Sequence, residues 1–494
     1  MPSSAVERFI LIKMQVSTAL DHIYLLNKNQ NILIIGAGLC GSLLALRMAQ
    51  RGYAVKLVEK RPDLRKEEQD AGRSINLALS DRGLKGLRLA GVEEKALQLC
   101  IPMLGRMIHD KEGNTFLSKY SGRENEYINS ISRPGLNMLL LDEAEKMPNV
   151  ELVFNKGCKS VDLQKASATF KDYVSGGEVS YEGDVILGTD GAGSVVRKSM
   201  FNHKKFLFSF SQEWLTHGYK EITIPKAEDG GYRTEKGALH IWPRGEDMLI
   251  ALPNLDGSFT VTLFLPYSNS DYCFDTLTTP KMVMEYFKKE YPDAVSLMPN
   301  LVEEFFNNPT GPLGTIKCSP WSAYGKTLLM GDAAHAIVPF YGQGMNASFE
   351  DVVVFDEVLD RFSSEENSSW ETIFQEYGKT RKKDTDAIAD LAVDNFHEMK
   401  EHTASPLFQQ KRKLETAFEA EFPQEYFSKY SLVTFNEDIT YSEALKKGRA
   451  QDKAILNLIA DGKITESMDL SKKLDIVKRE TIEVLHDDDV ISNL

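Results

Sequence analysis

The hydrophobic pattern near residue 30 predicts a β-α-β unit. Residues 31–35 (NILII) form a short apolar run rich in β-branched side chains, which is typical of a buried strand. Residues 40–51 carry apolar positions at helical spacing and end at Gly52, and residues 54–58 form a second apolar run that ends at Glu59. A strand, a helix and a strand in this order are typical of the first unit of a doubly wound parallel sheet.

Later apolar runs predict two more groups of strands. Residues 185–187 and 327–330 each meet a Gly/Asp turn and are predicted as distant strands of the same sheet. Between them lie four short apolar runs separated by Pro, Gly and Asp turns, at residues 220–224, 238–242, 248–252 and 259–265. These runs predict an inserted antiparallel sheet. From residue 348 onward the pattern is helical, apart from a polar loop at 362–370 and breaks near Pro406 and Pro423.

The composition excludes several classes of protein. Of the 494 residues, 42% are hydrophobic and 26% are charged, which is ordinary for a globular protein. The net charge of −14 makes the chain a poor candidate for binding nucleic-acid phosphates. Five cysteines without a C-x-x-C spacing indicate neither a zinc site nor disulfides, and they suit a reducing cytosol. We therefore expect a cytoplasmic protein that binds no nucleic acid and no metal.

No membrane anchor is predicted. The longest charge-free apolar stretch, residues 32–46, is shorter than the roughly 20 residues that a membrane helix needs. Residues 1–30 show neither the charge pattern nor the cleavage site of a signal peptide, so this leader is left unassigned.

Gly36, Gly38 and Gly41 follow the first strand with the spacing G-x-G-x-x-G. The first glycine permits a tight turn, the second lets the backbone approach a pyrophosphate, and the third lets helix and strand pack closely. The N-terminus of the next helix then supplies N–H groups for the phosphates. Glu59, at the end of the second strand, can accept hydrogen bonds from ribose hydroxyls and would repel a 2′-phosphate. The motif therefore predicts FAD or NAD, and not NADP, as the tightly bound nucleotide.

Two further blocks place carboxylates at the C-terminal edge of the same sheet. Asp190 and Gly191 follow the run at 185–187, and Gly331 and Asp332 follow the run at 327–330. Ligands of open α/β sheets bind at this edge. Taken singly, each aspartate is equally typical of a helix cap at a strand-to-helix turn.

The segment AIVPFYGQGMNASFED predicts a second helix whose N-terminus faces a ligand. The helix starts near Met345 and Asn346, directly after Gly342 and Gly344. Such an N-terminus stabilises nearby negative charge. The alternative interpretation is a glycine-rich helix start without any ligand.

Together these blocks resemble the single-component FAD-dependent aromatic hydroxylases, the class A flavin monooxygenases. The resemblance implies that FAD is the bound nucleotide, that Asp332 contacts its ribityl chain and that the second helix points at the flavin ring. The resemblance also implies that Asp190 contacts FAD or the pyridine nucleotide. The full set of cofactor-binding residues that it implies is Gly36, Gly38, Gly41, Glu59, Arg61, Arg133, Asp190, Asp332, Gly344, Met345 and Asn346.

The implied fold class is α/β. It combines a doubly wound, Rossmann-like FAD-binding domain with an inserted antiparallel-sheet substrate domain and a helical C-terminal part. We assign residues 31–205 and 311–361 to the FAD-binding domain, 206–310 to the substrate domain and 362–494 to the helical region.

Longer segments narrow the resemblance to the kynurenine 3-monooxygenase family. They are residues 71–77 (AGRSINL), 105–109 (GRMIH), 238–243 (ALHIWP), 251–262 (ALPNLDGSFTVT) and 429–435 (KYSLVTF). The resemblance runs from about residue 31 to the C-terminal helices. Tyr341 departs from it, since some members carry His or Phe at this position. The membrane-spanning tail of eukaryotic members is also missing.

The resemblance implies a binding site for L-kynurenine. Arg106 is implied to bind the substrate carboxylate, as a bidentate Arg commonly does, with Tyr120 and Tyr430 hydrogen-bonded to the same group. Asn395 and Phe340 are implied to line the same site. Without the resemblance, Arg106 is more typical of a surface or salt-bridged residue, and the two tyrosines are more typical of a core.

The implied reaction is the NADPH- and O₂-dependent hydroxylation of L-kynurenine to 3-hydroxy-L-kynurenine through a C4a-hydroperoxyflavin, a step of tryptophan catabolism toward NAD synthesis. Because the chain has a single G-x-G-x-x-G motif, NADPH is implied to dock transiently. We assign no catalytic side chain, because an aniline ring is electron-rich and needs no general base. His109, His240 and His335 are interpreted as structural residues.

Three alternatives are weighed beside this one. A hydroxylase of another aromatic acid would need the same flavin and an Arg. A non-catalytic FAD-binding protein could use the helical C-terminal part to contact a partner. A flavin halogenase is less favoured, because the sequence has no W-x-W-x-I-P signature.

Overall fold

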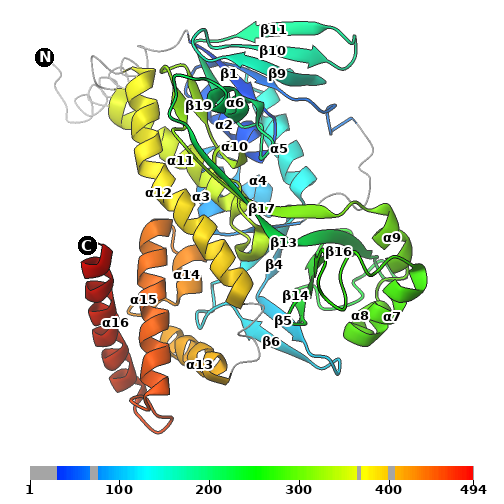
Figure 1. Cartoon of the computed structure of the whole chain (residues 1–494), viewed down its shortest axis with the longest axis vertical. Helices are drawn as coiled ribbons and strands as arrows, with labels where there is room; N and C mark the ends of the chain where they lie inside the picture. The colour runs from blue at the N-terminus through cyan, green and yellow to red at the C-terminus, as the bar shows by residue number, and fades with distance from the viewer. Residues whose placement is uncertain (1–29, 67–75, 364–368, 399–405, 493–494) are drawn as a thin grey trace, which may run out of the picture.

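The computed structural model describes residues 30–66, 76–363, 369–398 and 406–492. The leader up to residue 29 lies outside the described residues. So do residues 71–75, which are the first five residues of the family-like segment 71–77. Figure 1 shows three parts: a sheet with flanking helices around β1, a second sheet around β13 and β16, and a group of C-terminal helices around α15.

The first part is a six-stranded sheet in the order β18-β19-β12-β1-β2-β8. Its strands pair in parallel except for the pair of β18 and β19. The strands are β1 (Asn31–Ile35), β2 (Ala54–Val58), β8 (Val150–Val153), β12 (Val185–Gly188), β18 (Ser322–Ala323) and β19 (Thr327–Leu329). The doubly wound sheet predicted from the hydrophobic pattern is confirmed, and the predicted bounds of β1 and β2 match the structure.

Helices pack on this sheet because its strands are apolar on both faces. The covering helices include α2 (Leu39–Gln50), α5 (Arg133–Glu145) and α11 (Gly344–Ser363). Further helices of this part are α3 (Asp81–Leu89), α4 (Glu93–Leu97), α6 (Val195–Phe201) and α10 (Asp332–His335). Two small antiparallel sheets flank it. The first consists of β9 (Lys156–Asp162), β10 (Ser167–Asp172) and β11 (Glu178–Glu182). The second consists of β3 (Leu77–Leu79), β4 (Cys100–Met103) and β7 (Ile128–Ile131).

The second part is a seven-stranded sheet in the order β17-β13-β16-β15-β14-β5-β6. Its strands are β5 (Gly105–His109), β6 (Thr115–Lys119), β13 (Ser209–Ile224), β14 (Leu239–Pro243), β15 (Met248–Pro253), β16 (Phe259–Pro266) and β17 (Gly311–Ser319). All pairs are antiparallel except β5 with β14, which are parallel. Three short helices cover one face, α7 (Pro280–Glu290), α8 (Pro292–Val295) and α9 (Leu301–Asn307).

This sheet extends beyond the 206–310 segment that we predicted for it. Strands β5 and β6 at one end of the sheet come from residues 105–119, and the edge strand β17 at the other end comes from residues 311–319. Strand β13 also begins at Ser209 rather than near Lys220, and residues 209–214 are exposed. The hydrophobic pattern gives no signal there, because an exposed strand lacks the alternation of buried and polar positions. The division of the chain into domains stays a prediction.

The third part consists of C-terminal helices, as predicted from residue 348 onward. They are α12 (Trp370–His397), α13 (Pro406–Glu421), α14 (Lys429–Thr434), α15 (Tyr441–Ala460) and α16 (Leu470–Ser492). Pro406 begins α13 and Pro423 follows its end, in line with the predicted breaks. Within the described ranges, no helix is both long enough and apolar enough to cross a membrane.

A shared hydrophobic cluster joins the three parts. It contains Phe264 of β16, Phe340 of the short 3₁₀ helix η2 (Pro339–Tyr341), Ala347 of α11, and Leu432 of α14. Helix α12 packs on η2, so that the C-terminal helices close over the junction between the two large sheets. This junction is where the candidate site lies.

Candidate active site

A cavity of about 300 Å³ lies at the junction of the two sheets and the C-terminal helices. One end is bordered by Gly38 of α2, Asp332 of α10 and Gly344 of α11, which all belong to the six-stranded part. The other end is bordered by Arg106 of β5 and Tyr430 of α14. The cavity therefore brings together residues that the sequence assigned to two different ligands.

The glycine motif lies at the first end of the cavity, which its second glycine, Gly38, borders. Gly36 has a φ of +104°, and a Cβ there would lie 2.6 Å from the carbonyl oxygen of Thr189. A Cβ on Gly41 would lie 2.0 Å from the carbonyl oxygen of Gly36, so only glycine permits this packing of helix on strand. A Cβ on Gly38 would meet no protein atom within 4 Å. The space in front of Gly38 is thus open to a ligand at the N-terminus of α2, as the motif predicts.

Glu59 lies buried at the end of β2, where we predicted an acceptor for ribose hydroxyls. One carboxylate oxygen accepts from the backbone N–H of Ala37 at 2.8 Å. The other accepts from the Nε of Arg61 at 2.8 Å and from its backbone N–H at 3.1 Å. Glu59 is therefore fixed beside the glycine turn by contacts that include the exposed Arg61. Neither Glu59 nor Arg61 borders the cavity.

Asp332 and Arg133 both border the cavity. Arg133 begins α5, and Ser132 caps this helix by accepting from the backbone N–H of Gly135. Burial raises the pKa of Asp332 above its ordinary value, and the positive charge of Arg133 opposes this rise. A carboxylate and a guanidinium that face the same space can hold the hydroxyl groups and the phosphates of a dinucleotide.

The N-terminus of α11 also points into this end of the cavity. Gly344 and Met345, which we predicted to bind the cofactor, both border the cavity. Asn346 does not border it, because its side chain donates to the carbonyl oxygens of Ala78 and Gly342, each at 2.9 Å. It thus ties α11 to the chain before α3.

Asp190 stands apart from the other predicted cofactor residues. Its carboxylate accepts from the hydroxyl of Ser194 at 2.5 Å and from the backbone N–H groups of Val195 and Val196 at 2.7 and 3.3 Å. These contacts cap α6, which is the alternative weighed from the sequence. The neighbouring Thr189 and Gly191 border the cavity, whereas Asp190 does not.

Arg106 reaches the other end of the cavity from β5. Its guanidinium lies 4.5 Å from the ring centre of Tyr430 and 5.4 Å from that of Tyr120. Among the described residues, no carboxylate forms an ion pair with it. Burial alone would lower the pKa of Arg106, but the phenol oxygens of Tyr430 and Tyr120 raise it above the ordinary value. A permanently charged guanidinium therefore faces the cavity without an internal anion.

Tyr120 and Tyr430 form a stack beside Arg106. Their ring centres lie 5.6 Å apart with planes 9° from parallel, and Tyr341 also stacks on Tyr430, with ring centres 5.5 Å apart. The hydroxyl of Tyr120 is buried and has no hydrogen-bond partner in the described part of the chain. A buried hydroxyl without a partner costs free energy, so this group is poised for a ligand.

Phe340 and Asn395 lie next to this group. Phe340 borders the cavity and packs on Phe264 and Phe396, with ring centres 4.9 and 4.5 Å away. Asn395 of α12 donates to the carbonyl oxygen of Phe340 at 2.7 Å and holds the segment η2 in place. Asn395 borders a second cavity of about 80 Å³, which shares Arg106, Tyr341 and Tyr430 with the first.

Several residues of the site were missed by the sequence reasoning. Leu239, Ile241, Met248, Ile250, Leu252 and Phe264 line the cavity from β14, β15 and β16. Their alternation along the strands is a signal that could have found them. The second cavity also contains Lys429, whose ammonium pairs with Glu398 and with Asp452. No local pattern marks this group, because its members come from three different helices.

The three histidines interpreted as structural make contacts within the protein. Nδ1 of His109 lies 2.7 Å from Asp293, its Nε2 lies 2.9 Å from Nδ1 of His240, and Nε2 of His335 lies 2.6 Å from Asp351. None of the three borders the main cavity. Within the described residues, no cluster of metal-binding side chains is present.

Comparison with known proteins gives consistent matches. The model of a family described as "FAD binding domain" matches residues 29–206 and 302–392. A protein of Myxococcus xanthus named kynurenine 3-monooxygenase is 44% identical over 451 residues, which cover 91% of this chain and 95% of that protein. One of the same name from Dictyostelium discoideum is 43% identical over 88% of this chain and 94% of its own length.

Solved structures show the same fold. The tetrameric form of 2-methyl-3-hydroxypyridine-5-carboxylic acid oxygenase superposes with a TM-score of 0.61 and covers 81% of this chain and 99% of its own. The sequence identity is 21%, so this likeness bears on the fold alone.

Proposed function

Because this chain belongs to the kynurenine 3-monooxygenase family of FAD-dependent enzymes, we propose that its cavity binds L-kynurenine beside FAD and directs hydroxylation at ring position 3. The reaction consumes NADPH and O₂, as is usual for the family. The product is 3-hydroxy-L-kynurenine.

The residues at the first end of the cavity fit FAD. The open space before Gly38 and the N-terminus of α2 suit a pyrophosphate, and buried Glu59 suits a ribose. Asp332 would hold the ribityl chain, and the backbone at Gly344 and Met345 would face the flavin ring. When bound there, FAD would supply the redox chemistry of the reaction, namely the acceptance of a hydride from NADPH and the activation of O₂. We propose no direct contact of Arg61, Asp190 or the Asn346 side chain with it.

Two neighbouring groups carry the assignment of the substrate. Among the described residues, the guanidinium of Arg106 has no carboxylate partner and the hydroxyl of Tyr120 beside it has no hydrogen-bond partner. An amino-acid substrate brings a carboxylate, which would satisfy both groups at once. Because burial raises the pKa of Tyr120, its phenol stays protonated at neutral pH and can donate a hydrogen bond. Tyr430, which stacks on both Tyr120 and Tyr341, would complete the carboxylate site.

The remainder of the cavity suits the aromatic part of the substrate. Apolar side chains from β14, β15 and β16 line it, and Phe340 closes it beneath α12. These residues would hold the aniline ring and keep water away from the reacting atoms. Because an aniline is already electron-rich, no side chain is assigned as a general base.

We place the reaction in the cytoplasm. All five cysteines, which lie within the described ranges, are unpaired. Free thiols of this number suit a reducing compartment.

The test is NADPH oxidation by the purified, FAD-loaded protein. L-Kynurenine is expected to accelerate NADPH oxidation strongly, and mass spectrometry should identify 3-hydroxykynurenine as the product. Anthranilate and 4-hydroxybenzoate serve as comparison acids that lack the amino-acid tail. A rate that does not change across a kynurenine titration would overturn the proposal, as would hydroxylation of a comparison acid in preference to kynurenine.

A further inference from the structure

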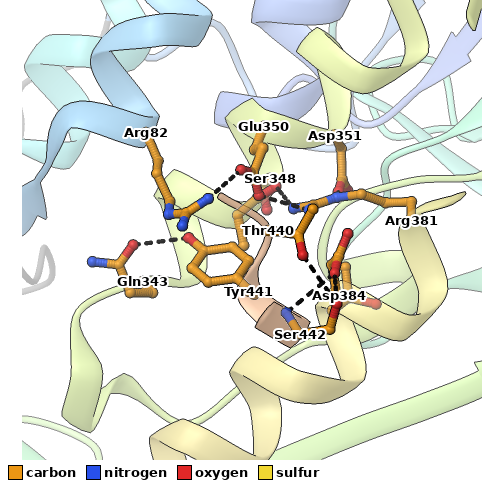
Figure 2. A network of polar contacts seen from close by, with 12 residues as sticks. Arg82, Gln343, Ser348, Glu350, Asp351, Arg381, Asp384, Thr440, Tyr441 and Ser442 are labelled. Carbon is orange, nitrogen blue, oxygen red and sulfur yellow. Dashed lines mark hydrogen bonds and ion pairs between the residues drawn. The ribbon is translucent and has the colours of Figure 1, made fainter. Parts of the chain in front are cut away.

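A buried polar cluster links the C-terminal helices to the cofactor side of the cavity. We define it by Arg82, Gln343, Glu350, Arg381 and Tyr441, all labelled in Figure 2. Arg82 comes from α3, Gln343 precedes α11, Glu350 lies within α11, and the other two come from α12 and α15. The cluster does not border the main cavity. It is therefore outside the cofactor and substrate contacts described above.

Arg82 holds the end of the helix that carries Tyr430. It is 1% exposed, and its guanidinium donates to the carbonyl oxygens of Val433 at 2.8 Å and Leu432 at 3.3 Å. It also donates to the carbonyl oxygen of Ile439 at 2.7 Å and pairs with Glu350 at 2.6 Å. The last carbonyl groups of a helix have no partner within the helix, so a buried helix end needs an outside donor. Arg82 supplies that donor for α14.

Helix α3, which carries Arg82, is packed closely on α11. A Cβ on Gly83 would lie 2.3 Å from the side-chain oxygen of Asn346, and one on Gly86 would lie 3.0 Å from the Cβ of Phe349. The spacing between these two helices is therefore fixed by the absence of side chains. Arg82 joins α3 to α14, so α14 is held in a fixed position relative to α11 as well. The first residues of α11 border the cofactor end of the cavity.

Tyr441 makes a second link between the same parts. Its hydroxyl donates to the side-chain oxygen of Gln343 at 2.9 Å, and its ring lies 4.2 Å below the guanidinium of Arg82. Gln343 stands between Gly342 and Gly344, which both border the cavity. The start of α15 is also held on α12, because Ser442 donates to Asp384 through its hydroxyl at 2.5 Å and its backbone at 3.2 Å.

We propose that Arg82 and Tyr441 are positioning residues for hydroxylation. They fix helix α14, and with it Tyr430, relative to the first turn of α11. In this way they set the distance between the bound kynurenine ring and the flavin side of the cavity. Helix α14 has six residues and cannot hold this position by itself. The inference rests on the proposed function, since it assumes that Tyr430 contacts the substrate.

The test compares two mild variants with a control on the same helix. Arg82→Lys keeps a cation for Glu350 but loses the planar fork that reaches three carbonyl groups. Tyr441→Phe removes a single hydroxyl. The control is Arg88→Gln, because Arg88 is exposed on α3 and pairs with Glu93 and Glu437 at the surface. For each FAD-loaded protein we would measure FAD content, the KM for kynurenine, and 3-hydroxykynurenine and H₂O₂ formed per NADPH at saturating kynurenine.

We expect Arg82→Lys to raise the KM for kynurenine about tenfold, and both variants to convert NADPH to H₂O₂ at the expense of product. FAD content should equal that of the wild type. A merely structural role would lower FAD content and product in proportion and leave the product-to-peroxide ratio unchanged, which would overturn the inference. Wild-type KM and product yield in both variants would do the same. A wild type that forms no 3-hydroxykynurenine would instead overturn the proposed function, and the inference with it.

Discussion

The phenol of Tyr120 offers a test in which stability and substrate affinity are expected to move in opposite directions. Tyr120→Phe keeps the aromatic ring and its stacking on Tyr430, at 5.6 Å between ring centres. It removes only a buried hydroxyl that has no partner in the described part of the chain. The substitution therefore deletes no hydrogen bond of the free protein that the described residues make.

The magnitudes follow from what the hydroxyl does in each state. A hydrogen bond to a charged carboxylate contributes about 1.5–3 kcal/mol, so losing it should weaken kynurenine binding by roughly 10- to 150-fold. In the free protein the same hydroxyl carries a desolvation cost of about 1–3 kcal/mol when it is unsatisfied. The free energy of unfolding should therefore rise on substitution, by at most that amount.

The assay pairs two titrations on the FAD-loaded protein. Kynurenine affinity is measured from the change in the flavin absorption spectrum, and stability is measured by urea unfolding without substrate. Tyr291→Phe is the matched control, because its buried hydroxyl donates to Asp247 at 3.2 Å away from the cavity. The control should lose stability and keep its kynurenine affinity.

One pattern would refute this reasoning. If Tyr120→Phe binds kynurenine as tightly as the wild type, the hydroxyl does not contact the substrate carboxylate. If it also unfolds more easily, the hydroxyl has a partner within the protein, and the argument from its unsatisfied state is wrong.

Three further outcomes are expected. Arg106→Lys should raise the KM for kynurenine by at least about tenfold with normal FAD content, because an ammonium cannot form the bidentate contact. Steady-state kinetics would measure this change, and an unchanged KM would show that Arg106 does not contact the substrate. Gly38→Ala should fold yet lose FAD, since its Cβ enters the open space at the start of α2. Gly41→Ala should also destabilise the apoprotein, since its Cβ would lie 2.0 Å from a carbonyl oxygen. FAD content and the melting temperature of the apoprotein distinguish the two variants. Burial lowers the pKa of His240 to about 4, so the stability that its neutral form contributes is fully present above about pH 6.5 and is lost as the pH falls toward 4. This amounts to about 3 kcal/mol at most, and His240→Gln should flatten that part of the pH dependence of urea unfolding.

The cofactor end of the site could be predicted from local sequence because it is built from backbone. Gly36 and Gly41 occupy positions where a Cβ would collide with a carbonyl oxygen, so these positions accept glycine and little else. Strands β1 and β2 are buried and apolar, which makes their bounds visible in the pattern. Exposed strands such as the first half of β13 carry no such signal and were missed.

The substrate end could not be predicted in this way. Arg106 lies in the five-residue strand β5, in which no other residue indicates a binding site. Its neighbour Tyr120 directly follows β6, and its neighbour Tyr430 belongs to α14. Nothing near each residue in the chain indicates the others, so these residues came from the resemblance alone. The structure adds two facts that give them chemical meaning: within the described ranges, the guanidinium of Arg106 has no carboxylate partner and the hydroxyl of Tyr120 has no hydrogen-bond partner.

In the proposed binding mode, the backbone at Gly38 and at the first turn of α11 would make the same contacts for any substrate and would fix where the flavin lies. If Arg106, Tyr120 and Tyr430 bind the substrate as proposed, the choice of substrate depends on how far they stand from that point. Because β5 and α14 belong to different parts of the fold, that distance is set by the contacts between the parts rather than by either part alone. Arg82 and Tyr441 make such contacts, which is why substitutions away from the cavity are expected to change the fate of the substrate.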